Sequence, residues 1–139
     1  MAYFKDAQEV YDTIGQLFTE LAADEELAPK FRQANTIVQY QHREPDSTIT
    51  VRLSQEEPTD IDFGETEMEP EVVMSMEADT AHRFWLGQVN VTTALARGEI
   101  KASGPVAKIL KLVPLTKPAF PRYKALLEAQ GRDDLVRID

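Results

Sequence analysis

Residues 87–104 have the sequence GQVNVTTALARGEIKASG, and the placement of its glycines decides how this part of the chain folds. Asn90 is suited to cap a short helix, because its side chain can accept a backbone N–H of the first turn. Gly98 would end that helix in the left-handed conformation that glycine adopts at no steric cost. Residues 99–103 then alternate as a short strand, which Gly104 closes.

Two more helices are predicted around this stretch. One precedes it, with Asp79 or Thr80 as its cap. The other follows it over residues 105–113, with Pro105 at its first position and Lys108 and Lys111 on its polar face. The residues predicted to face the core in the three helices are Ala81, Phe84, Trp85, Val91, Ala94, Leu95, Val106, Ile109, Leu110 and Val113.

Helices are also predicted at both ends of the chain. Apolar residues recur at helical spacing over residues 4–23, and a short helical turn is expected within residues 24–31. Pro121 is expected to start a last helix that ends at Gly131. Residues 133–139 are predicted to form a loose tail.

Four strands are predicted between the first helix and the stretch described above. Period-two alternation indicates strands over residues 36–42 and 48–53, which a turn at residues 44–47 joins as an antiparallel hairpin. Short strands are also predicted over residues 60–63 and 72–76. Helices would cover one face of this small antiparallel sheet, which gives an α+β fold in a single domain over residues 1–139.

Composition and charge exclude several classes of protein. The chain has 139 residues, no cysteine and a formal net charge of −9, which excludes disulfides and argues against nucleic acid as a partner. Residues 44–79 hold twelve acidic residues and one basic residue, whereas residues 97–124 hold seven basic residues and one acidic residue. Neither a signal peptide nor a membrane-spanning run is apparent, so a cytoplasmic protein is expected.

No catalytic or metal-binding pattern stands out. His42 is predicted to end a strand near the core and His82 to lie on a helix surface, and their spacing matches no metal site. The acidic residues from Asp60 onward imitate part of a calcium loop, but Glu65 occupies the position that requires glycine. We therefore expect no enzyme activity, no metal and no cofactor.

Residues 98–104, together with Gly87, Asn90 and the order of elements over nearly the whole chain, resemble the sterol carrier protein type 2 family of lipid-binding domains. The resemblance implies a five-stranded, mainly antiparallel sheet covered on one face by helices, with an apolar tunnel between sheet and helices. It also implies a fatty acid, fatty acyl-CoA, phospholipid or sterol as ligand. The C-terminal residues 137–139 differ from the peroxisomal address of many eukaryotic members.

An unusually apolar segment supports a lipid site. The candidate lipid-binding residues are Phe84, Trp85, Leu86, Val89, Val91, Leu95, Ile100, Ile109, Leu110, Leu112, Val113 and Leu115. Lys101, Lys108, Lys111 and Lys117 are candidates for contact with a lipid head group or, transiently, with an anionic membrane. Trp85 is the only tryptophan, so its emission should report ligand binding if it lines the pocket.

Two alternatives remain open at this stage. The first is a protein-interaction module of the same fold with a filled core and no lipid ligand. The second is an enzyme with the cone-shaped fold of nuclear transport factor 2, which is disfavoured because that cone ends in long curved strands and this chain ends in helices. The sequence does not indicate an oligomeric state.

Overall fold

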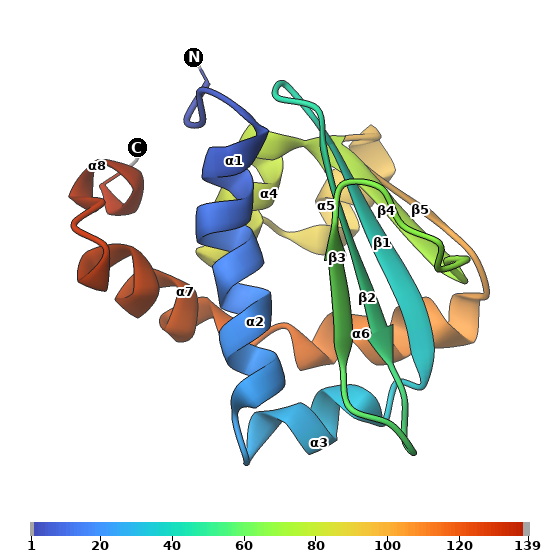
Figure 1. The fold of residues 1–139 in the computed structure, drawn as a ribbon. Coiled ribbons are helices and arrows are strands. Elements are labelled where there is room, and N and C mark those ends of the chain that lie inside the picture. Colours follow the sequence, from blue (N-terminus) through green and yellow to red (C-terminus); the bar gives the residue numbers. More distant parts are fainter. Residues whose placement is uncertain (1, 138–139) are drawn as a thin grey trace.

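The computed structural model describes residues 2–137 of the chain. Helices lie on one side of a five-stranded sheet, which is the predicted α+β architecture (Figure 1). The elements in chain order are α1 (Ala7–Val10), η1 (Tyr11–Gly15), α2 (Gln16–Ala23), α3 (Leu27–Arg32), β1 (Thr36–Arg43), β2 (Ser47–Leu53), β3 (Asp60–Phe63), β4 (Val72–Glu77), α4 (Ala78–Trp85), α5 (Val91–Arg97), β5 (Ile100–Ser103), α6 (Val106–Leu115), α7 (Ala119–Ala129) and α8 (Asp133–Val136).

The sheet has the strand order β3-β2-β1-β4-β5. Its neighbouring strands are antiparallel except for β1 and β4, which are parallel. The parallel pair arises because the chain adds β2 and β3 on one side of β1 and then returns to place β4 on the other side. The prediction of a mainly antiparallel five-stranded sheet is therefore confirmed, with one parallel pair.

Strand β1 is the central strand of the sheet, and some of its side chains point toward the helices. Tyr40 pairs with Ile49 of β2 on one side and with Met74 of β4 on the other. Because side chains alternate along a strand, Val38, Tyr40 and His42 share the face that the helices cover. Val38 and His42 are buried, as the period-two pattern predicts.

The N-terminal helical segment starts at residue 7 rather than residue 4. The Asp6 carboxylate accepts the backbone N–H of Glu9 at 3.0 Å and so fixes the helix start. Phe4 lies before the helix but is still buried in the core. One π-helical turn, η1, interrupts the α-helical geometry.

Helix α4 starts without the predicted side-chain cap. Strand β4 runs directly into α4, so Glu77 occupies the cap position and its side chain makes no capping hydrogen bond. Asp79 instead accepts the backbone N–H of Tyr3 at 2.9 Å. This contact ties the N-terminal segment to α4, which local sequence pattern could not show.

Helix α5 has the predicted ends. The Asn90 side chain accepts the N–H of Thr93 at 3.0 Å, and Gly98 ends the helix with a φ of 76°. The predicted inward stripe is only partly correct, because Ala94 is buried whereas Leu95 is exposed. Helix α6 begins at Val106, so Pro105 is its cap rather than its first residue.

The C-terminal region is more ordered than the sequence predicts. Helix α7 begins at Ala119, two residues before the expected start at Pro121. A further helix, α8, replaces much of the predicted loose tail, and its Leu135 is 1% exposed. Residues 138 and 139, the end of that predicted tail, lie outside the described residues.

Candidate functional site

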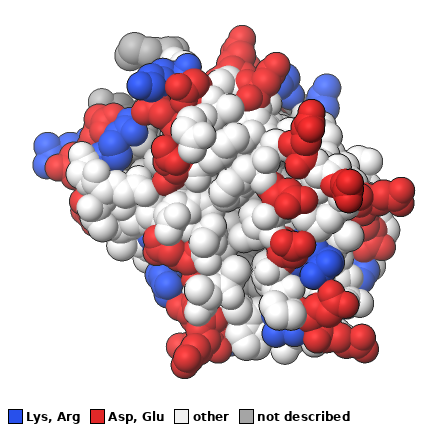
Figure 2. Space-filling model, in the orientation of Figure 1, with Lys and Arg blue, Asp and Glu red and all other residues white. Residues whose placement is uncertain are grey.

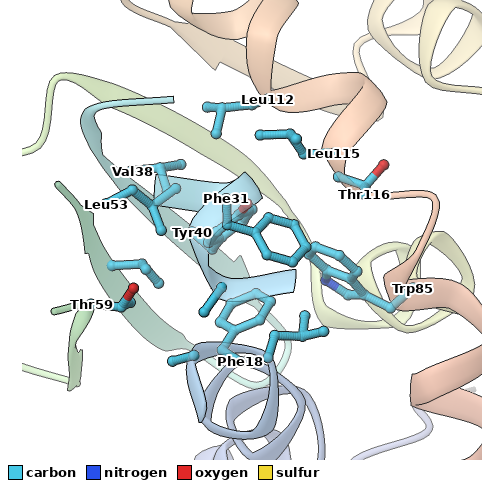
Figure 3. Close-up of a pocket in the computed structure, with 14 residues that line it drawn as sticks. Phe18, Phe31, Val38, Tyr40, Leu53, Thr59, Trp85, Leu112, Leu115 and Thr116 are labelled. Atoms are coloured by element: carbon cyan, nitrogen blue, oxygen red, sulfur yellow. The ribbon is translucent and has the colours of Figure 1, made fainter. Parts of the chain in front are cut away.

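An apolar cavity lies between the sheet and the helices, lined by residues from six helices and strands and by Thr59 and Thr116 from the segments between elements (Figure 3). It holds about 60 Å³ of space wide enough for water, and about 530 Å³ when all the space between its walls and its open mouth is counted. It is lined by Phe18, Leu21, Ala22, Ala28, Phe31, Val38, Tyr40, Val51, Leu53, Thr59, Trp85, Leu112, Leu115 and Thr116. We refer to this space as the first cavity.

Three aromatic side chains from separate elements form one wall of the first cavity. The ring centroids of Phe18 and Tyr40 are 5.2 Å apart, those of Phe18 and Trp85 are 5.1 Å apart, and those of Tyr40 and Trp85 are 6.1 Å apart. Edge-on and tilted contacts of this kind are favourable for aromatic rings. They fix the Tyr40 ring between α2 and α4.

A second apolar cavity, with about 30 Å³ of space wide enough for water, adjoins the first. Three residues line both cavities, and they are Tyr40 of β1, Leu112 of α6 and Thr116 directly after α6. The remaining lining of the second cavity is Met74, Met76, Phe84, Val91, Ile100 and Val113. Tyr40, Leu112 and Thr116 therefore separate two neighbouring spaces under the same helix.

Helix α6 covers both cavities, but none of its ten residues, all of which are described, is fully buried. Leu112 and Leu115 face the first cavity, whereas Val106 and Leu110 are 69% and 65% exposed. The predicted orientation, with Val106 and Leu110 facing the core, is therefore wrong. Apolar residues occur all around this helix, so the spacing that favoured Val106 and Leu110 was a weak guide to its buried face.

Few polar groups face the first cavity. Three of its lining residues, Tyr40, Thr59 and Thr116, carry a hydroxyl group, and every other lining residue is apolar. The Thr116 hydroxyl donates to the backbone carbonyl of Val113 at 2.7 Å. Burial raises the pKa of Tyr40, so its hydroxyl stays protonated and remains able to donate a hydrogen bond.

The structure brings seven of the twelve candidate lipid-binding residues to the cavities. Trp85 and Leu115 line the first cavity, Leu112 lines both, and Phe84, Val91, Ile100 and Val113 line the second. Neither cavity is lined by the other five, which are Leu86, Val89, Leu95, Ile109 and Leu110. Their part in lipid binding stays a prediction, although Leu95 and Leu110 are exposed.

The candidate residues predicted from the sequence did not include those on the sheet side of the first cavity or on its N-terminal helices. Val38 and Tyr40 of β1 and Val51 and Leu53 of β2 line the cavity on one side. Phe18, Leu21 and Ala22 of α2 and Ala28 and Phe31 of α3 line another. The alternation of the strands and the apolar stripe of residues 4–23 did indicate that most of these side chains face inward. They were expected to pack in the core, not to line a cavity.

The four candidate basic residues differ in their surroundings. Lys108 donates to the backbone carbonyl of Asn35 at 2.6 Å and lies 4.0 Å from a carboxylate oxygen of Glu71. Its ammonium group thus attaches α6 to the start of β1. Lys101, Lys111 and Lys117 are exposed, and their contact with lipid stays a prediction.

Basic and polar side chains line a surface hollow beside the first cavity. It is lined by Lys30, Gln33, Ala34, Gln55, Lys111 and Leu115. Because Leu115 also lines the first cavity, the hollow adjoins that cavity at the C-terminal end of α6. Arg122 follows α6 in the sequence but does not line this hollow. It forms an ion pair with Asp24 at 2.7 Å instead.

The two histidines are buried and lie outside both cavities. His42 is 4% exposed and contacts the Ser47 hydroxyl at 3.2 Å, and burial lowers its pKa to about 4. His82 is 0% exposed, so the prediction of a surface position is wrong. Within residues 2–137, no three His, Asp or Glu side chains are grouped in a way that could hold a metal ion.

Comparison with known proteins identifies the class. The family model described as the SCP-2 sterol transfer family matches residues 14–117, and the chain belongs to this family. Domains of this family are in general non-catalytic and bind or transfer lipids. The family match and the observed strand order remove the alternative of a nuclear-transport-factor-like fold. A search of curated proteins found no match.

Solved structures share the fold at low sequence identity. The sterol carrier protein domain 2 of Helicoverpa armigera is 18% identical with a TM-score of 0.67, over 87% of this chain and 95% of that one. The apo form of sterol carrier protein 2 from Yarrowia lipolytica is 16% identical with a TM-score of 0.61, over 81% of this chain and 91% of that one. Within residues 2–137, no helix is both long and apolar enough to cross a bilayer.

Proposed function

We propose that this chain binds the apolar part of one lipid between its sheet and helix α6, and transfers that lipid between membranes. Fatty acids, fatty acyl-CoA, phospholipids and sterol-like molecules are the candidate ligands. The observation that carries this proposal is the pair of adjoining apolar cavities under α6, which share Tyr40, Leu112 and Thr116 as lining residues. Burial of apolar surface at about 25 cal/mol per Å² would supply the affinity.

The size of the cavities implies that α6 moves when a ligand binds. The two cavities hold about 60 Å³ and 30 Å³ of space wide enough for water, and a single water needs roughly 10–15 Å³ by this measure. A long acyl chain therefore requires the two spaces to join and widen. Movement of Leu112 with α6 would join them and form the tunnel.

The surface hollow at Leu115 is the proposed mouth. Lys30 and Lys111 lie in it, and their charge would attract a phosphate or carboxylate head group. Acidic side chains are spread widely over the face shown in Figure 2, and the formal net charge is −9. Contact with an anionic membrane would therefore be local and transient, which suits delivery rather than anchoring.

The other expectations complete this proposal. The chain would act as one domain over residues 1–139, without catalytic activity, in the cytoplasm. Exposed Val106 and Leu110 on the outer side of α6 favour one alternative, a module that binds a partner protein through this helix.

Lipid titration separates these two functions. Purified protein would be titrated with palmitate, palmitoyl-CoA, phosphatidylcholine and cholesterol while Trp85 emission is followed, and the complexes would be weighed by native mass spectrometry. We expect saturable binding of one lipid per chain and a change in emission, because Trp85 lines the first cavity. Absence of saturable binding by all four lipids in both measurements would overturn lipid binding in favour of the interaction module.

A further inference from the structure

Within the described residues, two tyrosine hydroxyls take part in hydrogen bonds, whereas the Tyr40 hydroxyl takes part in none. The Tyr11 hydroxyl accepts the N–H of Thr48 at 3.3 Å, and the Tyr123 hydroxyl lies 2.8 Å from Nδ1 of His82. Among residues 2–137, by contrast, no group forms a hydrogen bond with the Tyr40 hydroxyl. The Tyr40 side chain is only partly buried, and its oxygen is not among the fully enclosed unpartnered atoms of the described residues, so a ligand can reach this hydroxyl and bond to it.

Tyr40 lies at the boundary between the two cavities of the proposed ligand site. Its ring projects from the central strand β1 and is held by Phe18 and Trp85. The side chain lines both cavities and lies among the residues that surround the first cavity in Figure 3. A ligand that fills both cavities must pass it.

Thr116 provides a second polar group at the same boundary. Its side chain also lines both cavities, and its proton is engaged by the carbonyl of Val113. The Thr116 oxygen can therefore only accept a hydrogen bond, whereas the protonated Tyr40 hydroxyl can donate one. A single ligand hydroxyl can accept from Tyr40 and donate to Thr116.

We propose that Tyr40 selects apolar ligands that carry a hydroxyl group on their skeleton, by donating a hydrogen bond to that hydroxyl as the ligand passes from the first cavity to the second. This inference rests on the proposed function and makes it more specific. A hydroxylated acyl chain and a sterol alcohol share this chemistry. Apolar molecules of the same skeleton without the hydroxyl would bind less tightly.

The test compares ligands that differ only in the hydroxyl group. Stearate would be compared with hydroxystearates that carry the hydroxyl at different chain positions, and cholesterol with 5-cholestene, which lacks the hydroxyl. For the unmodified protein we expect at least one hydroxylated ligand to bind about five- to tenfold more tightly than its counterpart, as one hydrogen bond can supply. The pair that shows the preference distinguishes acyl chain from sterol.

Substitutions then assign the preference to Tyr40. Tyr40→Phe should reduce the ratio to about one while stearate binds as well as before, and Thr116→Val should reduce the ratio in part. Tyr11→Phe is the matched control, because Tyr11 is bonded to Thr48 and lines neither cavity. Circular dichroism and the denaturation midpoint would verify folding, and if Tyr40→Phe does not fold, Thr116→Val decides.

Two failures are distinguishable. If all probes bind but the unmodified protein shows no preference for any hydroxylated ligand, or if the preference persists in the variants, the role of Tyr40 is overturned and lipid binding stands. If none of the probes binds saturably, the proposed function itself fails, and the selection by Tyr40 fails with it.

Discussion

The Nε2 atom of His82 lies 2.7 Å from the backbone carbonyl oxygen of Leu135, fifty-three residues later in the chain. A carbonyl oxygen only accepts, so Nε2 carries the proton and Nδ1 accepts from the Tyr123 hydroxyl at 2.8 Å. This fully buried imidazole therefore joins α4, α7 and α8.

Replacement of His82 should destabilise the protein. His82→Phe keeps a ring of similar size but leaves the Leu135 carbonyl and the Tyr123 hydroxyl without their partner. Since each buried unsatisfied group costs about 1–3 kcal/mol, we expect a loss of about 2–4 kcal/mol in the free energy of unfolding, measured by urea denaturation. The exposed Lys124→Ala on α7 should change it by less than about 0.5 kcal/mol. Equal stabilities for the two variants would contradict this role.

Stability should also fall as the pH falls, because both histidines are buried in the neutral form. Burial lowers the pKa of His42 to about 4 and also lowers the pKa of His82, whereas an unfolded histidine has a pKa of about 6.5. Between these values the unfolded chain binds more protons, so acid favours unfolding. Full stability is thus expected above about pH 6.5, with progressive loss toward pH 4.

Denaturation midpoints between pH 5 and 7.5 would check this dependence, since most carboxylates stay ionised in that range. The expected slope is at most about 1.4 kcal/mol per pH unit for each histidine. His42→Phe should flatten the curve. A pH-independent midpoint for the unmodified protein would refute the predicted loss of stability at low pH.

Two glycines with positive φ should respond differently to the same substitution. Gly104 has a φ of 127°, and a Cβ there would overlap the backbone carbonyl of Glu71. Gly98 has a φ of 76°, but a Cβ there meets nothing within 4 Å. We expect Gly98→Ala to cost about 1 kcal/mol, and Gly104→Ala to cost more, because β5 must shift away from β4. Thermal unfolding compares the pair, and similar losses would argue against the close approach at Gly104.

Filling the boundary between the two cavities should block ligand binding. Leu112 lines both cavities, so Leu112→Trp places a larger side chain in spaces of about 60 Å³ and 30 Å³. We expect palmitate affinity to fall at least about tenfold, or about 1.4 kcal/mol. Leu110→Trp is the control on the same helix, because Leu110 is 65% exposed. Calorimetric titration that gives equal affinities for both variants would rule out the cavities as the site.

The proposed mouth can be tested by reversing its charge. The double variant Lys30→Glu, Lys111→Glu should slow lipid transfer between anionic vesicles, since each basic residue near such a surface contributes about 1 kcal/mol. The slowing should shrink at high salt, where charges are screened. The single variant Lys124→Glu changes an exposed lysine that does not line the hollow and should transfer lipid more nearly like the unmodified protein. Equal rates for all three proteins would exclude the mouth.

Local patterns were sufficient for most elements of the fold. Asn90 and Gly98 cap the two ends of α5 as predicted, and all five strands occur where alternation indicated them. These features depend on residues within a few positions of one another, so they can be recognised without knowledge of the tertiary structure.

The site and the buried histidines depend on distant partners. His82 is buried because Tyr123 and Leu135 satisfy its two nitrogen atoms, and neither is near it in sequence. Alternation predicted that Tyr40 faces inward, but whether inward side chains leave a cavity depends on how α6 packs over them. Helical spacing placed Leu110 on the inward stripe of α6, whereas packing turns Leu112 toward the cavity and leaves Leu110 exposed.

Helix α6 is less firmly held in the fold than the sheet beneath it. None of its residues is fully buried, and Pro114 has no N–H to bond the carbonyl of Leu110. Strand β1, in contrast, is paired along both edges. Local opening of α6 therefore costs less free energy than global unfolding, and its amide protons should exchange with solvent while those of β1 stay protected. The rate at which ligand enters or leaves would then be set by this opening equilibrium, in a protein whose sheet remains intact.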